Sequence, residues 1–278
     1  MADGLKLALY GLHRGDEGPE VLARRALRAE AVGFEGLWVG DHIALPPSMG
    51  DHPRLEALVT LAYLAAVTTT VRLVVGVVVL PQRQPVLFAK QLSSIDRLSG
   101  GRLTVGIGVG WVEQELRALG ASLADRGART DEYLAAMRAL WDEPAPAFDG
   151  RFVAFEDVLQ RPLPVQRPHP PIVVGGHSPA AYRRAVEAGN GWFGWDLDLE
   201  QTAAALAGLR EAAGRHERPA GLGELEITVT PRGEVDADRA RLYADLGVHR
   251  LALLPRATGD GAVDELIESV GETLVGRV

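Results

Sequence analysis

The stretch most informative about the fold is RLTVGIGVGW, residues 102–111, in which an apolar run leads directly into glycines at every second position. Gly106, Gly108 and Gly110 have no side chain to hold a ligand away from the main-chain N–H groups. The acidic, leucine-rich segment 112–119 is typical of a helix that begins at the same place. A strand end of this kind can bind an anion or a flat ring. A tightly packed strand exit has the same pattern, so the rest of the chain must decide between them.

Short apolar runs alternate along the chain with longer amphipathic segments. The run LVVGVVVL, residues 73–80, is apolar on both faces, as expected of a parallel strand in a sheet covered by helices. Eight strands alternating with helices predict an α/β fold, a (β/α)₈ TIM barrel. The expected strands are 5–10, 36–39, 72–80, 102–108, 171–175, 191–195, 225–230 and 249–254. The expected helices are 18–32, 53–69, 85–99, 112–141, 178–188, 199–214, 236–246 and 261–275.

One segment departs from this alternation. Residues 142–170 are rich in proline, are too long for an ordinary connection, and contain the hairpin-like sequence FDGRF at 148–152. A solvated linker has no need of Phe148, Phe152 and Phe155, so we expect a docked insertion after the fourth helix. We expect a single domain over residues 1–278, with the insertion at about 142–170.

The composition limits the function classes. The net charge is −8, and no cluster of basic residues is interleaved with aromatic ones, which argues against a nucleic-acid surface and favours a small-molecule partner. There is no cysteine, and the seven histidines lack the spacing of a metal site on a helix. No signal peptide or membrane span is apparent, so the cytoplasm is the default expectation.

Two further motifs combine glycine with a polar residue. In Gly175-Gly176-His177-Ser178, the glycines and a serine N-cap present several N–H groups at a helix start, which favours anion binding; the alternative is a tight turn with a capping serine. His177 either adds positive charge there or is solvated. The motif SGGR, residues 99–102, is best interpreted as a glycine helix stop followed by an arginine that pairs with a carboxylate.

Several segments together resemble one family, the bacterial luciferase-like flavin and deazaflavin oxidoreductases, and in particular the branch that uses coenzyme F420. The likeness extends from about residue 5 to about residue 195 and is looser beyond. The segments that carry it are GLWVGDH (36–42), LSGGR (98–102), GIGVGW (106–111), Arg126 with Arg129 and Glu132, and VGGHS (174–178).

The resemblance implies roles for individual residues. His42 is expected to hydrogen-bond the cofactor ring or donate a proton, and Asp41 to orient its imidazole. A non-proline cis peptide bond supports the ring in this family, and its position corresponds here to Val78–Val79. The cofactor phosphate is expected at 175–178. Without the resemblance, Asp41 would be taken for a turn cap and the valines for core.

The chain also departs from the family's sugar-phosphate dehydrogenases. Trp111 stands where those enzymes have an acidic glutamate, and no lysine occurs beyond residue 90, so a sugar-phosphate substrate is not expected. Trp111 and Trp195 are candidates for the substrate pocket. Trp192 is expected in the core.

These observations predict an F420-dependent oxidoreductase that transfers a hydride between the deazaflavin C5 and an unidentified organic substrate. The alternatives are an FMN-dependent monooxygenase on the same barrel and a cofactor-binding homologue without turnover. F420 carries an anionic tail, for which Arg183 and Arg184 are candidate partners. Family members are often dimers, so the resemblance also raises a homodimer, although the sequence does not determine the oligomeric state.

Overall fold

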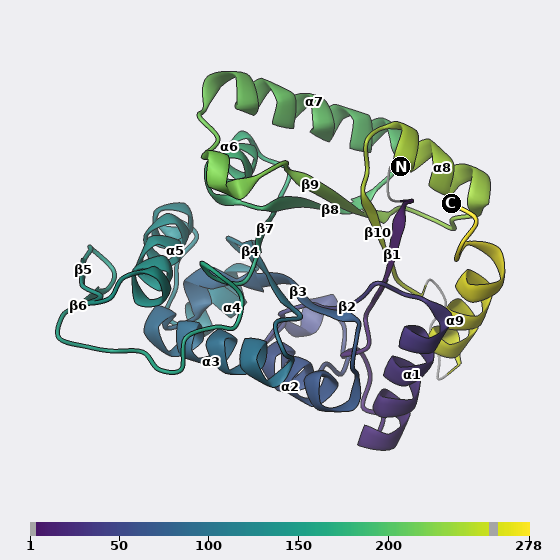
Figure 1. Ribbon diagram of the computed structural model, residues 1–278, viewed down its shortest axis with the longest axis horizontal. Helices are drawn as coiled ribbons and strands as arrows, with labels where there is room; N and C mark the ends of the chain where they lie inside the picture. The colour runs from purple at the N-terminus through teal and green to yellow at the C-terminus, as the bar shows by residue number, and fades with distance from the viewer. Residues whose placement is uncertain (1–3, 256–260) are drawn as a thin grey trace.

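The computed structural model describes residues 4–255 and 261–278. Eight parallel strands close into a barrel in the order β1-β10-β9-β8-β7-β4-β3-β2, which confirms the predicted class. The strands enclose the centre of the molecule, and the helices lie outside them (Figure 1). The barrel strands are β1 (Lys6–Tyr10), β2 (Gly36–Val39), β3 (Arg72–Val79), β4 (Leu103–Gly108), β7 (Ile172–Gly175), β8 (Gly191–Leu197), β9 (Glu226–Pro231) and β10 (Arg250–Leu253).

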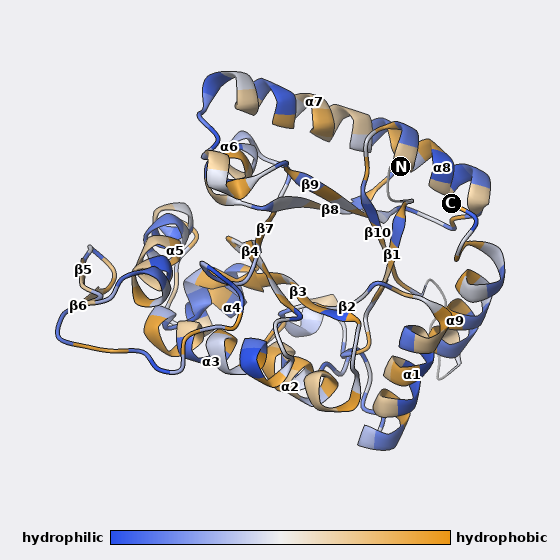
Figure 2. Ribbon diagram, viewed as in Figure 1, coloured by the Kyte–Doolittle hydropathy of each residue, from blue (hydrophilic) through white to orange (hydrophobic). Residues whose placement is uncertain are grey.

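The helices cover the barrel with their apolar sides, and Figure 2 shows hydrophobic residues interleaved with hydrophilic ones along most of them, as an amphipathic covering layer requires. The exception is α2, with the sequence ALVTLAYLAAV, which is apolar almost throughout. No helix within the described residues has both the length and the apolar character needed to cross a membrane. The helices are α1 (Pro19–Val32), α2 (Ala57–Val67), α3 (Pro85–Leu98), α4 (Glu113–Ala118), α5 (Arg126–Asp142), α6 (Pro179–Ala188), α7 (Leu199–Arg215), α8 (Ala237–Asp245) and α9 (Ala262–Thr273), with the 3₁₀ turns η1 (Pro47–Met49), η2 (Leu80–Gln82) and η3 (Ala220–Leu222).

The segment 112–141 is not the single helix that its composition predicts. It forms α4 and α5, separated by a turn over residues 119–125. Gly120 has a φ of 74°, a left-handed conformation that glycine adopts without strain and that ends a helix. The short α4 follows the carboxyl end of β4 and so begins at the mouth of the barrel, by which we mean the end where the carboxyl termini of the strands lie.

The insertion is docked on the barrel, as its aromatic residues predict. Its strands β5 (Phe148–Asp149) and β6 (Ala154–Phe155) form an antiparallel hairpin beside α5, at the left edge of Figure 1. The Glu132 carboxylate of α5 accepts N–H groups from residues 151–153 at 2.6–3.0 Å. Further along, Asp96 of α3 accepts the N–H groups of residues 165 and 166.

Alternation along the strands produces two apolar layers. The outward-facing side chains pack against the helices. The inward-facing side chains fill the interior of the barrel. They lie between the mouth and the opposite end, which we call the floor. These inner residues are Ala8, Tyr10, Trp38, Val74, Val173, Phe193 and Ala252, with the partly buried Val77 and Leu254 packed against them.

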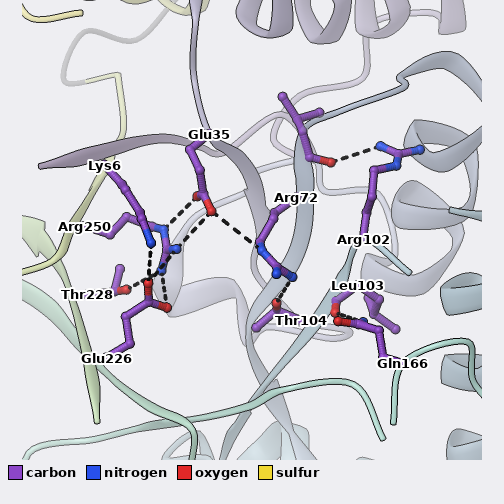
Figure 3. Close-up of polar contacts among 11 residues, drawn as sticks. Lys6, Glu35, Arg72, Arg102, Leu103, Thr104, Gln166, Glu226, Thr228 and Arg250 are labelled. Atoms are coloured by element: carbon purple, nitrogen blue, oxygen red, sulfur yellow. Dashed lines mark hydrogen bonds and ion pairs between the residues drawn. The ribbon is translucent and has the colours of Figure 1, made fainter. Parts of the chain in front are cut away.

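A charged network occupies the floor (Figure 3). The Arg250 guanidinium lies between two carboxylates and donates to both oxygens of Glu35 at 2.8 and 3.0 Å and to both oxygens of Glu226 at 2.9 and 3.0 Å. Lys6 also pairs with Glu226, at 3.2 Å, and Arg72 lies 3.7 Å from Glu35. Bidentate pairs fix the orientation of both partners, so the network fastens β1, β9 and β10 to the start of β2.

Among the residues that the structure describes, Arg102 forms no ion pair with a carboxylate, contrary to the sequence-based expectation. The helix stop itself is present, because Gly100 and Gly101 have positive φ values of 67° and 87°. The helix and loop ends nearby expose carbonyl oxygens that need donors, and the guanidinium supplies them. Its carbonyl partners, at 2.8–3.0 Å, are Ser99, Ala65, Thr68 and Val71.

Glu30 on α1 gives the fold a measurable dependence on pH. Partial burial tends to raise its pKa, but the N–H groups of Thr70, Val71 and Thr69 outweigh this and lower the pKa from 4.5 to about 2. A pKa lowered by folding stabilises the protein above the unfolded value, and this stabilisation is lost as the pH falls from about 4.5 toward 2.

We expect Glu30→Gln to lower the free energy of unfolding by about 1 kcal/mol at neutral pH, a modest effect because the site is partly solvated. The difference from wild type should shrink as the pH falls below 4.5. Urea titrations at several pH values measure it, with the exposed Glu20→Gln on the same helix as the matched control. A pH-independent difference would contradict this assignment.

Candidate functional site

Asp41, at the mouth, is a buried carboxylate that connects two strand ends. It follows β2 and is 4% exposed. One oxygen accepts the N–H of Val79 at 3.1 Å, and the other pairs with Arg83, which also lies 2.8 Å from Glu56. Burial raises the pKa of Asp41, and the Arg83 guanidinium offsets part of that rise. Both oxygens are occupied in joining the end of β2 to the end of β3.

His42 is paired with a different carboxylate. Its Nδ1 lies 3.0 Å from Oε2 of Glu115, a residue of α4 whose side chain is 1% exposed. The other oxygen of Glu115 accepts the N–H groups of Ile43 and Ala44 at 2.5 and 3.1 Å. Burial alone would raise the pKa of Glu115, but the hydrogen bonds from His42 and these amides hold it below its ordinary value. The loop after β2 is therefore fastened to α4 through an ionised carboxylate.

The expectation that Asp41 orients the imidazole is wrong. Asp41 and His42 are adjacent in sequence, but Asp41 pairs with Arg83 and His42 with Glu115. Sequence reasoning missed Glu115. The acidic start of the segment after the glycines was a signal for it, but nothing in the sequence distinguishes the buried Glu115 from the exposed Glu113 beside it.

The third strand bends as the family resemblance implies, but at another residue. The cis peptide bond is Gly76–Val77, not Val78–Val79, and the pairing of β3 with β4 shifts between Val75 and Val78. The expected cofactor contacts of Val78 and Val79 need correction too. Val78 packs in the outer core, and Val79 packs against Leu116. Val77 is the partly exposed valine, packed against the inner layer of the barrel.

Glycines in β4, just after it and at the end of β7 make room for this bend. A Cβ at Gly108 would lie 2.7 Å from a methyl of Val77, and one at Gly175 would lie 2.8 Å from its other methyl. A Cβ at Gly106 would collide with the carbonyl oxygen of Val75. Gly110, with a φ of 76°, lies against Val79. The glycines therefore present Val77 to the barrel interior, where the sequence alone suggested bare backbone.

Gly175 is the last residue of β7, and residues 176–178 are exposed beyond it. Ser178 is the N-cap of α6, and its hydroxyl accepts the N–H of Ala181 at 3.3 Å. Gly176 has a φ of 126°. His177 accepts the N–H of Trp195 at 3.1 Å, and burial lowers its pKa, so it is a neutral group that fastens the turn to β8. The N–H groups at this helix start remain on the surface at the mouth.

Aromatic rings border the mouth on the side of β1. Tyr10 and Trp195 lie with ring centres 4.9 Å apart, and the Arg14 guanidinium is 5.6 and 5.9 Å from these two rings. Burial, followed by the charges of Arg14 and Arg54, lowers the pKa of His13 to about 3. His13 is therefore neutral at pH 7, and its Nε2 accepts the N–H of Gly40 at 3.1 Å.

The tryptophans differ in exposure. Trp195 is 38% and Trp111 is 66% exposed, and the Trp111 ring meets the His42 ring edge-on at 6.4 Å between centres. Both lie at the mouth, as substrate-pocket candidates should. Trp192 is fully buried, as predicted, and donates to the carbonyl of Gly176 at 2.8 Å.

Arg183 and Arg184 do not form the basic patch suggested for an anionic tail. Both guanidinium groups pair with Asp131, at 3.0 and 2.6 Å, and Arg183 also pairs with Glu187 at 2.5 Å. Their charges are therefore balanced locally by Glu187, one helical turn from Arg183 on α6, and by Asp131 of α5, which is 52 residues from Arg183 in sequence.

Comparisons with known proteins identify the family. The model of the luciferase-like monooxygenase family matches residues 8–267. An uncharacterized protein of Mycobacterium tuberculosis is 36% identical over 241 residues, which cover 80% of this chain and 81% of that protein. An FMNH(2)-dependent dimethylsulfone monooxygenase of Pseudomonas putida is 30% identical over 221 residues, 78% of this chain and 60% of that protein.

Among solved structures, an F420-dependent secondary alcohol dehydrogenase has a TM-score of 0.82 at 16% identity, covering 98% of both chains. A Pseudomonas putida type II Baeyer-Villiger monooxygenase in complex with FMN has a TM-score of 0.65 at 17% identity, covering 87% of this chain and 71% of that one. At such identities the likeness shows the fold. The family model covers nearly the whole barrel, and the chain belongs to the luciferase-like monooxygenase family.

Proposed function

We propose that this protein is an F420-dependent oxidoreductase that transfers a hydride between the deazaflavin and a small organic substrate. The observation that carries the proposal is the placement of His42. Its side chain is 29% exposed at the mouth, and it is held by a carboxylate that is itself 1% exposed. A partly exposed imidazole fastened at one ring nitrogen is suited to moving a proton at the other.

The residues at the mouth fit a deazaflavin in two respects. Val77 offers an apolar side chain inside the barrel, against which a flat ring can rest. The exposed N–H groups of residues 176–178, at the start of α6, suit the phosphate. Bound there, the deazaflavin would supply the hydride donor or acceptor. The protein's own part is to hold the ring and phosphate, exclude water with the tryptophans, and manage the proton.

His42 accepts or donates the proton that accompanies hydride transfer. When a substrate hydroxyl is oxidised to a carbonyl, the carbon loses a hydride and the oxygen loses a proton. Nε2 of His42, the ring nitrogen that Glu115 does not contact, accepts this proton. In the reverse direction the same nitrogen donates the proton.

An FMN-dependent monooxygenase is the second candidate. The 30% identity to an FMNH(2)-dependent enzyme favours it, because that relative is closer in sequence than the F420-dependent structures. The ring support by Val77 and the phosphate contacts at 176–178 suit either cofactor, since both carry a tricyclic ring and a ribityl phosphate. The adjacent residues Asp41 and His42 resemble the motif of F420-using members, and this sequence likeness is what favours F420, although in the structure His42 pairs with Glu115 and Asp41 with Arg83.

A titration separates the candidates. The apoprotein is titrated with F420, FMN and, under anaerobic conditions, FMNH₂, and the dissociation constants are compared. We expect F420 to bind at least about tenfold more tightly than either flavin, a difference of about 1.4 kcal/mol. Equal or tighter binding of FMN or FMNH₂ would reject F420 in favour of the monooxygenase.

Variants locate the phosphate in the same titration. Ser178→Ala removes a hydroxyl and Gly176→Val obstructs the approach to the backbone, so both should weaken binding of the preferred cofactor. Removing the serine also removes a helix cap, at a cost of about 1 kcal/mol in stability. Asp236→Ala, which removes the cap of α8, is the matched control and should leave the dissociation constant unchanged. Unchanged binding in both site variants would place the phosphate elsewhere.

A further inference from the structure

We propose that Glu115 is a positioning residue that selects the ring tautomer of His42 and so makes Nε2 the nitrogen that exchanges a proton with the substrate. The catalytic consequence rests on the proposed function. The tautomer itself does not, because it follows from contacts within the protein alone.

The argument begins with the two oxygens of the carboxylate. Oε1 of Glu115 receives two backbone donors, the N–H groups of Ile43 and Ala44. Backbone amides only donate, so this oxygen can serve only as an acceptor. Oε2 is then the one oxygen that meets the imidazole, at 3.0 Å from Nδ1.

Protonation states follow from this pairing. Glu115 is ionised at neutral pH, because its hydrogen bonds hold its pKa below the ordinary value. An ionised carboxylate has no proton to donate, so Nδ1 of His42 must carry the hydrogen. In the neutral ring the lone pair is then on Nε2, and this nitrogen can act as a base.

Several features make the pairing rigid. The Glu115 side chain is 1% exposed, so water does not compete for its oxygens. The amides of Ile43 and Ala44 belong to the same loop as His42, so the carboxylate fixes the backbone and the ring together. The Trp111 ring lies edge-on to the imidazole.

Glu115→Gln gives a sharp test, because the amide is nearly the same shape as the carboxylate. The two backbone donors require the amide oxygen at the Oε1 position. The NH₂ group must then face Nδ1 of His42, which has to become an acceptor. The substitution should therefore move the hydrogen from Nδ1 to Nε2, and the ring loses its base at the mouth without losing its hydrogen bond.

The tautomer is measured by long-range ¹H–¹⁵N correlation NMR on the apoprotein labelled with ¹⁵N-histidine, at a pH where the ring is neutral. The signals of His42 are assigned by their loss in His42→Ala. We expect the Nδ1–H form in wild type and the Nε2–H form in Glu115→Gln. Glu113→Gln, an exposed change on the same short helix, should leave the tautomer unchanged. An Nε2–H form in wild type, or an Nδ1–H form in Glu115→Gln, would overturn the proposal, and the wild-type result decides even if the variant folds poorly.

Kinetics provide the second readout. On a substrate turned over by wild type, Glu115→Gln should lower kcat by about 10²-fold or more, as expected when a catalytic histidine is held in the wrong tautomer, and change KM within a few-fold. A raised KM with an unchanged kcat would show that Glu115 only shapes the loop. If F420 does not bind, the proposed function fails while the tautomer result stands, so the two failures are distinguishable.

Discussion

Replacing Arg250 by methionine is expected to lower the free energy of unfolding by about 3 kcal/mol, near the lower end of the range for breaking a buried ion pair. The Arg250 side chain is 5% exposed and donates to both oxygens of Glu35 and of Glu226. Methionine has a similar length but leaves both carboxylates without this partner. The cost is moderated because Glu35 and Glu226 remain 27% and 34% exposed and keep some contact with water.

Equilibrium unfolding in urea measures this difference. Arg241→Met is the matched control, because Arg241 is 53% exposed and pairs with a fully solvated aspartate, so its loss should cost less than about 1 kcal/mol. Adding Glu35→Gln and Glu226→Gln to Arg250→Met should recover part of the loss, since the two glutamate positions then carry no uncompensated charge. Lys6 and Arg72 lose these partners but are 38% and 40% exposed, so water can solvate their charges. Equal stabilities of the Arg250 and Arg241 variants would show that the floor network does not stabilise the barrel.

His42→Ala is expected to lower hydride transfer by about 10²–10⁴-fold, the usual contribution of general acid–base catalysis. Cofactor affinity should change within a few-fold, because His42 does not belong to the segment proposed to hold the phosphate. Single-turnover absorbance of the deazaflavin, with a substrate accepted by wild type, measures the hydride step separately from binding.

The control is His52→Ala, an exposed histidine on the same loop after β2. It should leave both hydride transfer and cofactor affinity unchanged. If His42→Ala turned over as fast as this control, His42 would have no part in the proton transfer, whatever the cofactor.

The barrel was predictable because its signals are local and repeated. A parallel strand covered by helices must be apolar on both faces, and each strand must be followed by an amphipathic helix, so the sequence carries the pattern eight times over. The expected strand 36–39 coincides with β2. The expected helix 112–141 was wrong, because the left-handed conformation of Gly120 ends α4. The pattern of apolar residues does not reveal such a backbone conformation.

The site was predictable only as far as the strand ends. The sequence placed Asp41, His42, Gly108 and Ser178 after strands, and in a barrel these positions all lie at the mouth. It did not identify the partners. Glu115 is 73 residues from His42, and Asp131 is 53 residues from Arg184. Such pairings depend on how elements far apart in the chain are brought together.

The sequence by itself determined the class of fold, the position of the insertion and the family, because these depend on periodicity, turn chemistry and motif order along the chain. Only the tertiary structure decided which carboxylate holds His42, which valine faces the barrel interior and which charges neutralise Arg183 and Arg250. The physical reason is that hydrogen bonds and ion pairs act over about 3 Å in space. Neighbours in sequence such as Asp41 and His42 can point apart, while residues from different strands and helices meet.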